Sequence, residues 1–175
     1  MFLTDAVDEM SDLENENAAN QYLEVYKLTL KGDWGTLRDC LERDPSLLHA
    51  KIAGLGDTVL HVAVSTGHSA DFVSSLVEYV PASCIELRND VESTPLHFAA
   101  IAGNTVAAKI LVKKNPGTPL LRNRDGHTPL YHAAQFGHRQ TFCFLSNIPD
   151  QDPSPFAEGS GREILKFLIT ADFYG

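Results

Sequence analysis

Histidines are the side chains with the greatest capacity for chemistry in this sequence of 175 residues, which contains seven of them. Imidazole binds metals and transfers protons near neutral pH. Four of these histidines take fixed places in short segments that resemble one another, so we interpret them as structural. Two others lie near those segments without a fixed place and remain candidates for contact with a ligand. The structural four are His61, His68, His97 and His138, and the open two are His127 and His132.

No catalytic motif accompanies these histidines. The sequence lacks a GxSxG nucleophile elbow, a Walker-type glycine loop and an HExxH zinc motif. We therefore expect no catalytic residue, no metal site and no cofactor, and we interpret the chain as not being an enzyme. The enzymatic alternative is a small hydrolase that uses histidine and acidic residues. It would need a deep pocket, and a closed cavity around His127 and His132 would favour it.

The cysteines indicate a reducing environment. Cys40, Cys84 and Cys143 are odd in number, widely spaced and without a CxxC pair, which is typical of reduced thiols in an intracellular protein. Free cysteine is among the most buried residue types. We therefore expect all three side chains in the core and place the protein in the cytoplasm.

An internal repeat organises the chain. Residues 58–68 read TVLHVAVSTGH, residues 94–104 read TPLHFAAIAGN and residues 128–138 read TPLYHAAQFGH. The opening threonines, Thr58, Thr94 and Thr128, recur at nearly equal intervals, and the leucines, alanines and glycines of the segments keep the same intervals. Self-similarity at such a period indicates stacked supersecondary units.

Each letter of the segment has a physical role, which residues 94–104 illustrate. Thr94 can cap a helix, and Pro95 suits its first turn because the missing N–H would be unpaired there anyway. Leu96 and Ala99 share one helical face, where the small alanine lets a neighbouring helix approach closely. Gly103 permits the left-handed conformation that ends a helix. Second helices are predicted at 69–80, 105–114 and 139–147, each running to a proline a few residues later.

These segments resemble the T-P-L-H-x-A pattern of the ankyrin repeat, and the resemblance covers about residues 21–148. It implies an all-α fold, an ankyrin-repeat solenoid of stacked helix-turn-helix units with β-turn fingers. Leu60, Leu96 and Leu130 should share one seam. The repeats are placed at 21–55, 56–91, 92–125 and 126–148, and the first is a capping repeat because it lacks the Thr-Pro start.

A narrower likeness joins the segments GHSADFVSSLVEYVP, GHTPLYHAAQFGH and FLITADFYG. They resemble the N-terminal repeats of plant ankyrin proteins that carry a C-terminal membrane domain with a Pro-Gly-Gly signature. Membership implies stress, salt or immune signalling on the cytosolic side of the plasma membrane. The sequence departs from that family because it has neither the membrane spans nor the signature.

The flanks depart from the repeat. Residues 1–20 are acidic and asparagine-rich with little periodicity, and we predict a disordered tail. Residues 149–161 contain three prolines and two glycines and predict a long loop. Residues 162–175 return to a helical pattern and predict a partial fifth repeat.

Charge limits the classes of partner. The net charge is −9, which disfavours attraction to nucleic acid or to a membrane surface. The sequence starts with acidic residues where a secretory signal would be basic, and it has no apolar run that could insert into a membrane. Membrane association is implied by the family likeness alone. We expect a monomer that binds a protein of unknown identity. A basic cluster is interpreted as a solvated helix end, or alternatively as contacting an acidic segment such as residues 5–16; it contains Lys113, Lys114, Arg122 and Arg124.

The variable positions around each motif predict the binding surface, because the repeat does not use them for its own stability. Four of them are apolar and could form one stripe, although isolated surface hydrophobics and contacts between repeats are the alternatives. These four are Leu55, Val91, Ile101 and Phe136. The other predicted contacts are Asp57, Ser65, Thr66, Asp90, Ser93, Ala102, Arg124, Asp125, His127 and Gln135. The function expected is that of a non-catalytic interaction module or adaptor.

Overall fold

A computed structural model describes residues 2–149 and 160–170, with the backbone alone described over 2–16 and at 160. Throughout these residues the regular structure is helical, which confirms the predicted all-α solenoid. The α-helices are α1 Phe2–Lys31, α2 Trp34–Arg43, α3 Val59–Ser65, α4 Ala70–Tyr79, α5 Pro95–Ile101, α6 Thr105–Lys114, α7 Pro129–Gln135, α8 Arg139–Ser146 and α9 Ser160–Thr170. Short 3-10 helices follow three of them, η1 Pro45–Leu48, η2 Ala82–Glu86 and η3 Thr118–Leu120.

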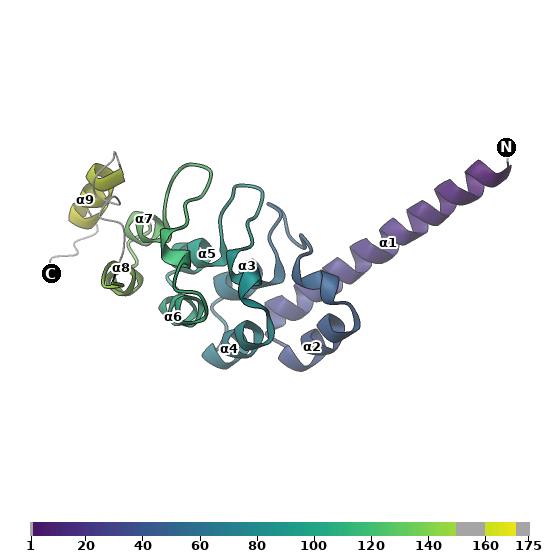
Figure 1. The fold of residues 1–175 in the computed structure, drawn as a ribbon, viewed down its shortest axis with the longest axis horizontal. Coiled ribbons are helices and arrows are strands. Elements are labelled where there is room, and N and C mark those ends of the chain that lie inside the picture. The colour runs from purple at the N-terminus through teal and green to yellow at the C-terminus, as the bar shows by residue number, and fades with distance from the viewer. Residues whose placement is uncertain (1, 150–159, 171–175) are drawn as a thin grey trace.

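The helices form two layers (Figure 1). We call α1, α3, α5, α7 and α9 the inner helices and α2, α4, α6 and α8 the outer helices. Within the inner layer α3 packs on α5, α5 on α7 and α7 on α9, while α4 packs on α6 in the outer layer. Long loops rise between the pairs on one side of the stack. Each unit therefore contacts mainly its neighbours, as in other repeat proteins.

Helix starts and stops follow the motif. Thr58 and Thr94 each form a capping box with the histidine three residues later. Gly67, Gly103 and Gly137 adopt φ values of 68°, 68° and 71° and end the inner helices. Only glycine reaches this left-handed region without strain, so the chain can reverse into the outer helix.

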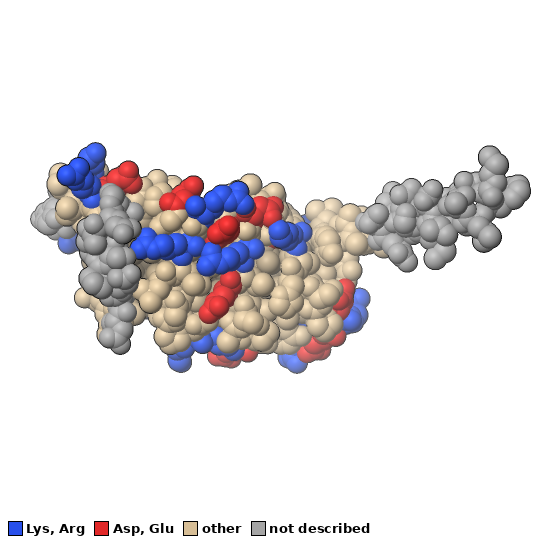
Figure 2. Space-filling view, turned by 45° about the horizontal axis from the view of Figure 1, so that its top comes forward, with Lys and Arg blue, Asp and Glu red and all other residues tan. Residues whose placement is uncertain are grey.

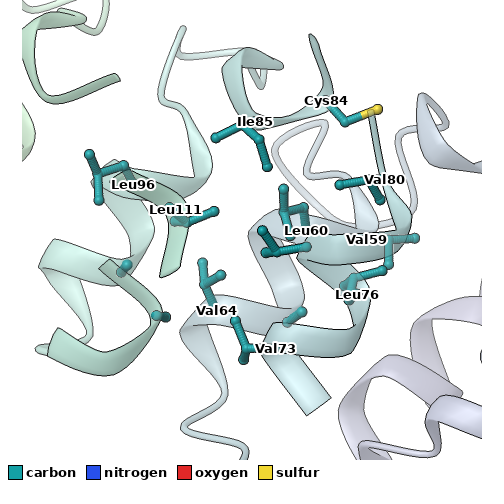
Figure 3. Packing of buried hydrophobic residues seen from close by; sticks show 14 of the residues in the cluster. Val59, Leu60, Val64, Val73, Leu76, Val80, Cys84, Ile85, Leu96 and Leu111 are labelled. Carbon is teal, nitrogen blue, oxygen red and sulfur yellow. The ribbon is translucent and has the colours of Figure 1, made fainter. Parts of the chain in front are cut away.

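One continuous core runs through the repeats. It is built from one apolar face of each helix from α1 to α8, and Figure 3 shows its centre between α3, α4, α5 and α6. Leu60, Leu96 and Leu130 are 3%, 0% and 2% exposed and belong to this one cluster. The shared seam expected from their spacing is confirmed.

Two flanks differ from expectation or fall outside the description. The structure continues α1 through residues 2–20, where the sequence predicted a disordered tail; no Pro or Gly interrupts residues 2–31, so nothing ends the helix locally. Of the predicted loop at 149–161, residues 150–159 lie outside the described residues. The helix expected from 162 begins at Ser160 and is described to Thr170, and the remainder of the predicted partial repeat, 171–175, lies outside the described residues.

Candidate functional site

Three hairpin-like loops precede the inner helices α3, α5 and α7, and we call residues 53–57, 89–93 and 123–127 the fingers. Each finger is closed by the same pair of backbone hydrogen bonds. In the last finger Asn123 N–H donates to the His127 carbonyl at 3.0 Å and Gly126 N–H donates to the Asn123 carbonyl at 2.9 Å. Equivalent bonds close the other two fingers, so the three tips present side chains in one register.

The fingers are also joined to each other. Asp90 N–H donates to the Leu55 carbonyl at 2.8 Å, and Arg124 N–H donates to the Val91 carbonyl at 3.1 Å. The Asn89 amide adds a bond of 2.7 Å to the Asp57 carboxylate. Backbone hydrogen bonds therefore join adjacent fingers into a ladder, and this ladder fixes the positions of the side chains at the tips.

Charged side chains reinforce this ladder. Arg88 donates to the Arg122 carbonyl at 2.7 Å, Arg122 donates to the Gly126 carbonyl at 2.8 Å, and Lys51 pairs with Asp90. Arg124 donates to the Asp90 carbonyl. Figure 2 shows basic and acidic groups interleaved across this face. The basic cluster predicted from sequence is thus divided, because its two arginines serve the fingers while its two lysines lie at the end of α6.

Histidines at the motif position connect successive repeats. Nδ1 of His61 accepts from the Thr58 N–H at 3.2 Å, and Nε2 lies 2.9 Å from the Ser93 carbonyl of the next finger. His97 repeats the arrangement, with Nε2 3.1 Å from the His127 carbonyl. Desolvation lowers the pKa of His61 and lowers that of His97 to about 3. Both rings are neutral framework groups, which agrees with the structural role expected from sequence.

The last complete repeat uses a different residue in this position. Tyr131 replaces histidine, and its hydroxyl donates to Glu163 of α9 at 2.7 Å. His127 stacks on the Tyr131 ring with centroids 3.7 Å apart. His132 is 9% exposed, lies 3.2 Å from the Asn123 amide, and has a pKa lowered mainly by burial. Both histidines left open by the sequence are therefore engaged within the fold.

The remaining candidates for metal or thiol chemistry differ in exposure. Nε2 of His138 donates to the Ile101 carbonyl over 2.8 Å, whereas the buried Nε2 of His68 has no hydrogen-bond partner. Cys40 and Cys84 are buried as expected, but Cys143 is exposed. Among the described residues no three His, Cys, Asp or Glu side chains gather in a way that could hold a metal ion.

The predicted binding positions fall mostly on the surface. Leu55, Ser65, Asp90, Ala102, Arg124, Asp125, Gln135 and Phe136 are exposed, and Asp57, Thr66, Val91, Ile101 and His127 are half-buried. Ser93 departs from the set, since it is 4% exposed and its N–H and carbonyl are used by Asn89 and His61. Its backbone is part of the framework, and its side chain is too buried to line the surface.

The four apolar positions form two rows instead of one stripe. Leu55 and Val91 lie on fingers, before the inner helices begin, whereas Ile101 ends α5 and Phe136 directly follows α7. An inner helix of seven residues separates the rows by about 10 Å, at 1.5 Å per residue. Leu55 and Phe136 are the most exposed of the four, at 55% and 52%.

The row at the ends of the inner helices, formed by Ile101 and Phe136, has one further member that the sequence analysis missed. Ile169 of α9 is 68% exposed and takes the place in its unit that Gln135 and Ile101 take in the two preceding units. The signal that could have identified it is Ile164, which follows Leu130 at the interval that separates Leu130 from Leu96. The missing Thr-Pro start concealed this register.

Within the described part of the chain, no helix combines the length and the hydropathy needed to cross a membrane.

Comparisons with known proteins agree with this geometry. A family model for ankyrin repeats in three copies matches residues 60–155. The nuclear factor NF-kappa-B p105 subunit of Gallus gallus is 30% identical over 124 residues, which are 67% of this chain and 12% of that protein. The putative E3 ubiquitin-protein ligase XBAT31 of Arabidopsis thaliana is 29% identical over 126 residues, which are 72% of this chain and 26% of that protein.

A solved structure supports the same fold. One chain in the crystal structure of the yeast ribosomal protein Rps3 in complex with its chaperone Yar1 superposes with a TM-score of 0.65 at 22% identity, covering 77% of this chain and 97% of that one. The sequence relatives are much longer, so this chain spans only a small part of their length. The family match covers more than half of the sequence, and the chain belongs to the ankyrin-repeat family.

Proposed function

We propose that the chain is a non-catalytic adaptor that binds a protein partner through its finger tips and the ends of its inner helices. Ankyrin repeats are protein-interaction modules, and the division of labour in this chain supports that use. The motif residues Thr94, Leu96 and His97 are buried and bonded within the stack. The variable positions beside them are exposed, so a partner can contact them without disturbing the framework.

The observation that carries the proposal is the exposure of Phe136. Phe136 is 52% exposed at a position that the repeat does not need, and its ring lies near His138 with centroids 6.5 Å apart. Burying the remaining apolar area of such a ring contributes about 1 to 2 kcal/mol. Aromatic side chains with this exposure are frequent anchors of interfaces.

The test compares surface and framework substitutions. Phe136→Ala and Ile101→Ala should weaken capture of the partner at least about tenfold, while the chain stays folded. Leu96→Ala, which removes a fully buried side chain, should instead lower the free energy of unfolding by about 2 to 5 kcal/mol. The partner is first identified with the intact chain, and each variant is then titrated with it. Equal losses of stability in both sets would remove the case for the surface.

A second candidate is the cytosolic ankyrin part of a membrane-associated plant signalling regulator. It is supported by the likeness of residues 67–81, 126–138 and 167–175 to that group and by the small share, 12% and 26%, that the matched segments form of longer relatives. In this case the chain lies in the cytoplasm beside the plasma membrane. Sequencing the full transcript tests it: codons for an apolar span downstream of Gly175 favour the candidate, and an immediate stop codon refutes it.

A further inference from the structure

Charge changes sign along the stack. Residues 1–92 contain 6 Lys and Arg against 17 Asp and Glu, a net charge of −11, and 6 of those acidic residues lie between positions 5 and 16 with no base nearby. Residues 93–149 contain 6 Lys and Arg against 1 acidic residue, a net charge of +5. A chain with a net charge of −9 therefore has one strongly basic section.

The outer helices hold most of that basic section. Lys109, Lys113 and Lys114 lie on α6 and Arg139 lies on α8, and neither helix contains Asp or Glu. Lys109 sits 5.8 Å from the centroid of the Phe144 ring, and Lys114 reaches the Glu78 carbonyl at 3.4 Å. In the described part of the chain, the ion pairs involve neither Lys109 nor Lys113. Among the described residues no carboxylate therefore lies within ion-pair distance of either lysine, although Glu78 of α4 lines the same hollow as Lys113.

An apolar groove runs beside Lys109, and Lys113, one turn further along α6, lines a smaller hollow between α4 and α6. The groove lies between α6 and α8, has a volume of about 620 Å³, and its floor includes Phe144 and Ile148. Among its described lining residues Lys109 alone is charged, and Val106 on the exposed side of α6 is 50% exposed. We call Val106, Lys109, Lys113, Phe144 and Ile148 the basic outer surface. Lysines four residues apart beside apolar side chains suit a helix that carries carboxylates at the same spacing.

The chain itself contains a segment of that chemistry. Residues 5–16 carry −6 and belong to α1, which has 30 residues and is about 45 Å long at 1.5 Å per residue. The inner helix α3 has 7 residues, so most of α1 extends beyond the stack. Figure 1 shows that it projects from the end opposite α8. A helix in that direction cannot reach the basic outer surface of its own chain.

We propose that the basic outer surface docks the acidic N-terminal segment of a second copy of this chain. Opposite charges steer the encounter and make it dependent on salt. The apolar groove supplies contact area that charge alone does not provide. The consequence is weak self-association in place of the monomer expected from sequence. This site lies on the outer helices, whereas the surface proposed above for the protein partner lies on the fingers and the ends of the inner helices. Phe136→Ala should therefore self-associate normally.

Sedimentation velocity of the intact chain tests the proposal. At about 0.05 M salt the weight-average mass should rise with concentration, and at about 0.5 M salt it should stay that of a monomer. Lys113→Glu should raise the dissociation constant at least about tenfold. Lys166→Glu is the matched control, because it makes the same charge change at another exposed lysine, on α9. Thermal unfolding verifies that both variants are folded.

A charge-reversal pair makes the assignment specific. The double variant Asp8→Lys, Asp12→Lys should not self-associate. Adding Lys109→Glu and Lys113→Glu to the same chain should restore self-association. Restoration identifies the two surfaces as partners. A monomer at every concentration in low salt, or self-association that survives Lys113→Glu, overturns the proposal. Binding of the monomer to anionic phosphatidylserine vesicles through the same lysines would also overturn it, in favour of a membrane surface.

Discussion

Among single residues, Glu92 stands in a conformation that the other fingers reserve for glycine. Its φ is 59°, and the equivalent Gly56 and Gly126 have φ values of 74° and 78°. A side chain in this region raises the energy by about 1 kcal/mol or more. We predict that Glu92→Gly stabilises the fold by about 0.5 to 1 kcal/mol, because the greater freedom of glycine in the unfolded chain offsets part of the gain. Urea unfolding measures the difference.

Gly126→Ala is the reciprocal experiment. A Cβ at position 126 would meet no atom within 4 Å, so the substitution introduces backbone strain without a clash. It should lower the free energy of unfolding by about 1 kcal/mol. If neither substitution moved the urea midpoint, strain in the finger turn would not be a determinant of stability.

The buried histidines make stability depend on pH. Desolvation lowers the pKa of His97 to about 3 and lowers those of His61 and His132. Histidine in the unfolded chain has a pKa of about 6.5. Below that pH the unfolded chain binds protons that the buried rings of the folded chain do not bind. The contribution of these rings to the free energy of unfolding is therefore fully present above about pH 6.5 and is lost as the pH falls toward about 3. Each histidine contributes a slope of up to about 1.4 kcal/mol per pH unit.

Urea midpoints between about pH 7.5 and pH 4.5 check this dependence, since carboxylates titrate mainly below that range. The midpoint should decrease steadily as the pH is lowered. A midpoint that is constant or that increases would mean that the rings are protonated inside the fold. That result would contradict their role as neutral bridges between repeats.

At this scale the sequence predicts roles better than exposure. The spacing of His61 and His97 identifies them as framework groups, because the motif defines which atoms they meet. The predictions for Ser93 and Cys143 are wrong. Ser93 is 4% exposed and its carbonyl bonds to His61, and the offset from the motif reveals neither fact. Cys143 takes the place on α8 that the exposed Lys109 takes on α6, so comparing outer helices would have predicted its exposure.

Among elements, the inner and outer helices are set by local signals. Threonine and glycine limit α3, α5 and α7, and their regular interval makes both limits visible in the sequence. The length of α1 is different, because acidic composition suggested disorder while the absence of Pro and Gly allowed a helix to continue. The start of α9 also lies earlier than its apolar pattern indicates. At both ends of the chain, composition and apolar pattern therefore predicted less helix than the structure contains.

The glycines that end the inner helices have unequal surroundings. Gly67 and Gly103 share a φ of 68°, but a Cβ at Gly103 would lie 2.4 Å from Nδ1 of His138, while a Cβ at Gly67 would meet nothing within 4 Å. We predict that Gly67→Ala lowers the free energy of unfolding by about 1 kcal/mol. Gly103→Ala should lower the free energy of unfolding by about 1 to 3 kcal/mol more than Gly67→Ala does, because the next repeat must shift to relieve the clash.

Chemical unfolding of the two alanine variants measures this difference. Adding His138→Ala to both should make their losses alike, since the clash is then removed. If the two losses were already equal with His138 present, the close approach between α5 and the start of α8 would have no energetic meaning.

At the scale of the molecule, two hydrophobic clusters of unequal size hold the stack. The large cluster extends from Val25 to Leu145 and includes residues of every helix pair. The small one joins α9 to α7 through Tyr131, Ala134, Ile164 and Leu168. Glu163 accepts from the Tyr131 hydroxyl, and desolvation together with this carboxylate raises the tyrosine pKa to about 12. The phenol therefore remains a donor at neutral pH, but in the described part of the chain α9 packs mainly on α7.

Unequal attachment predicts that the stack opens from its C-terminal end. Ile164 is 0% exposed and belongs to the small cluster, so Ile164→Ala should release α9 while the other repeats keep their packing. Hydrogen exchange followed by mass spectrometry should show faster exchange in residues 160–170 by about tenfold or more, with α3 to α6 unchanged. Leu76→Ala in the large cluster is the control and should accelerate exchange across several repeats. If Ile164→Ala also accelerated exchange in α3 and α4, the repeats would unfold as one cooperative unit, and the separation of the two clusters would not govern how the stack opens.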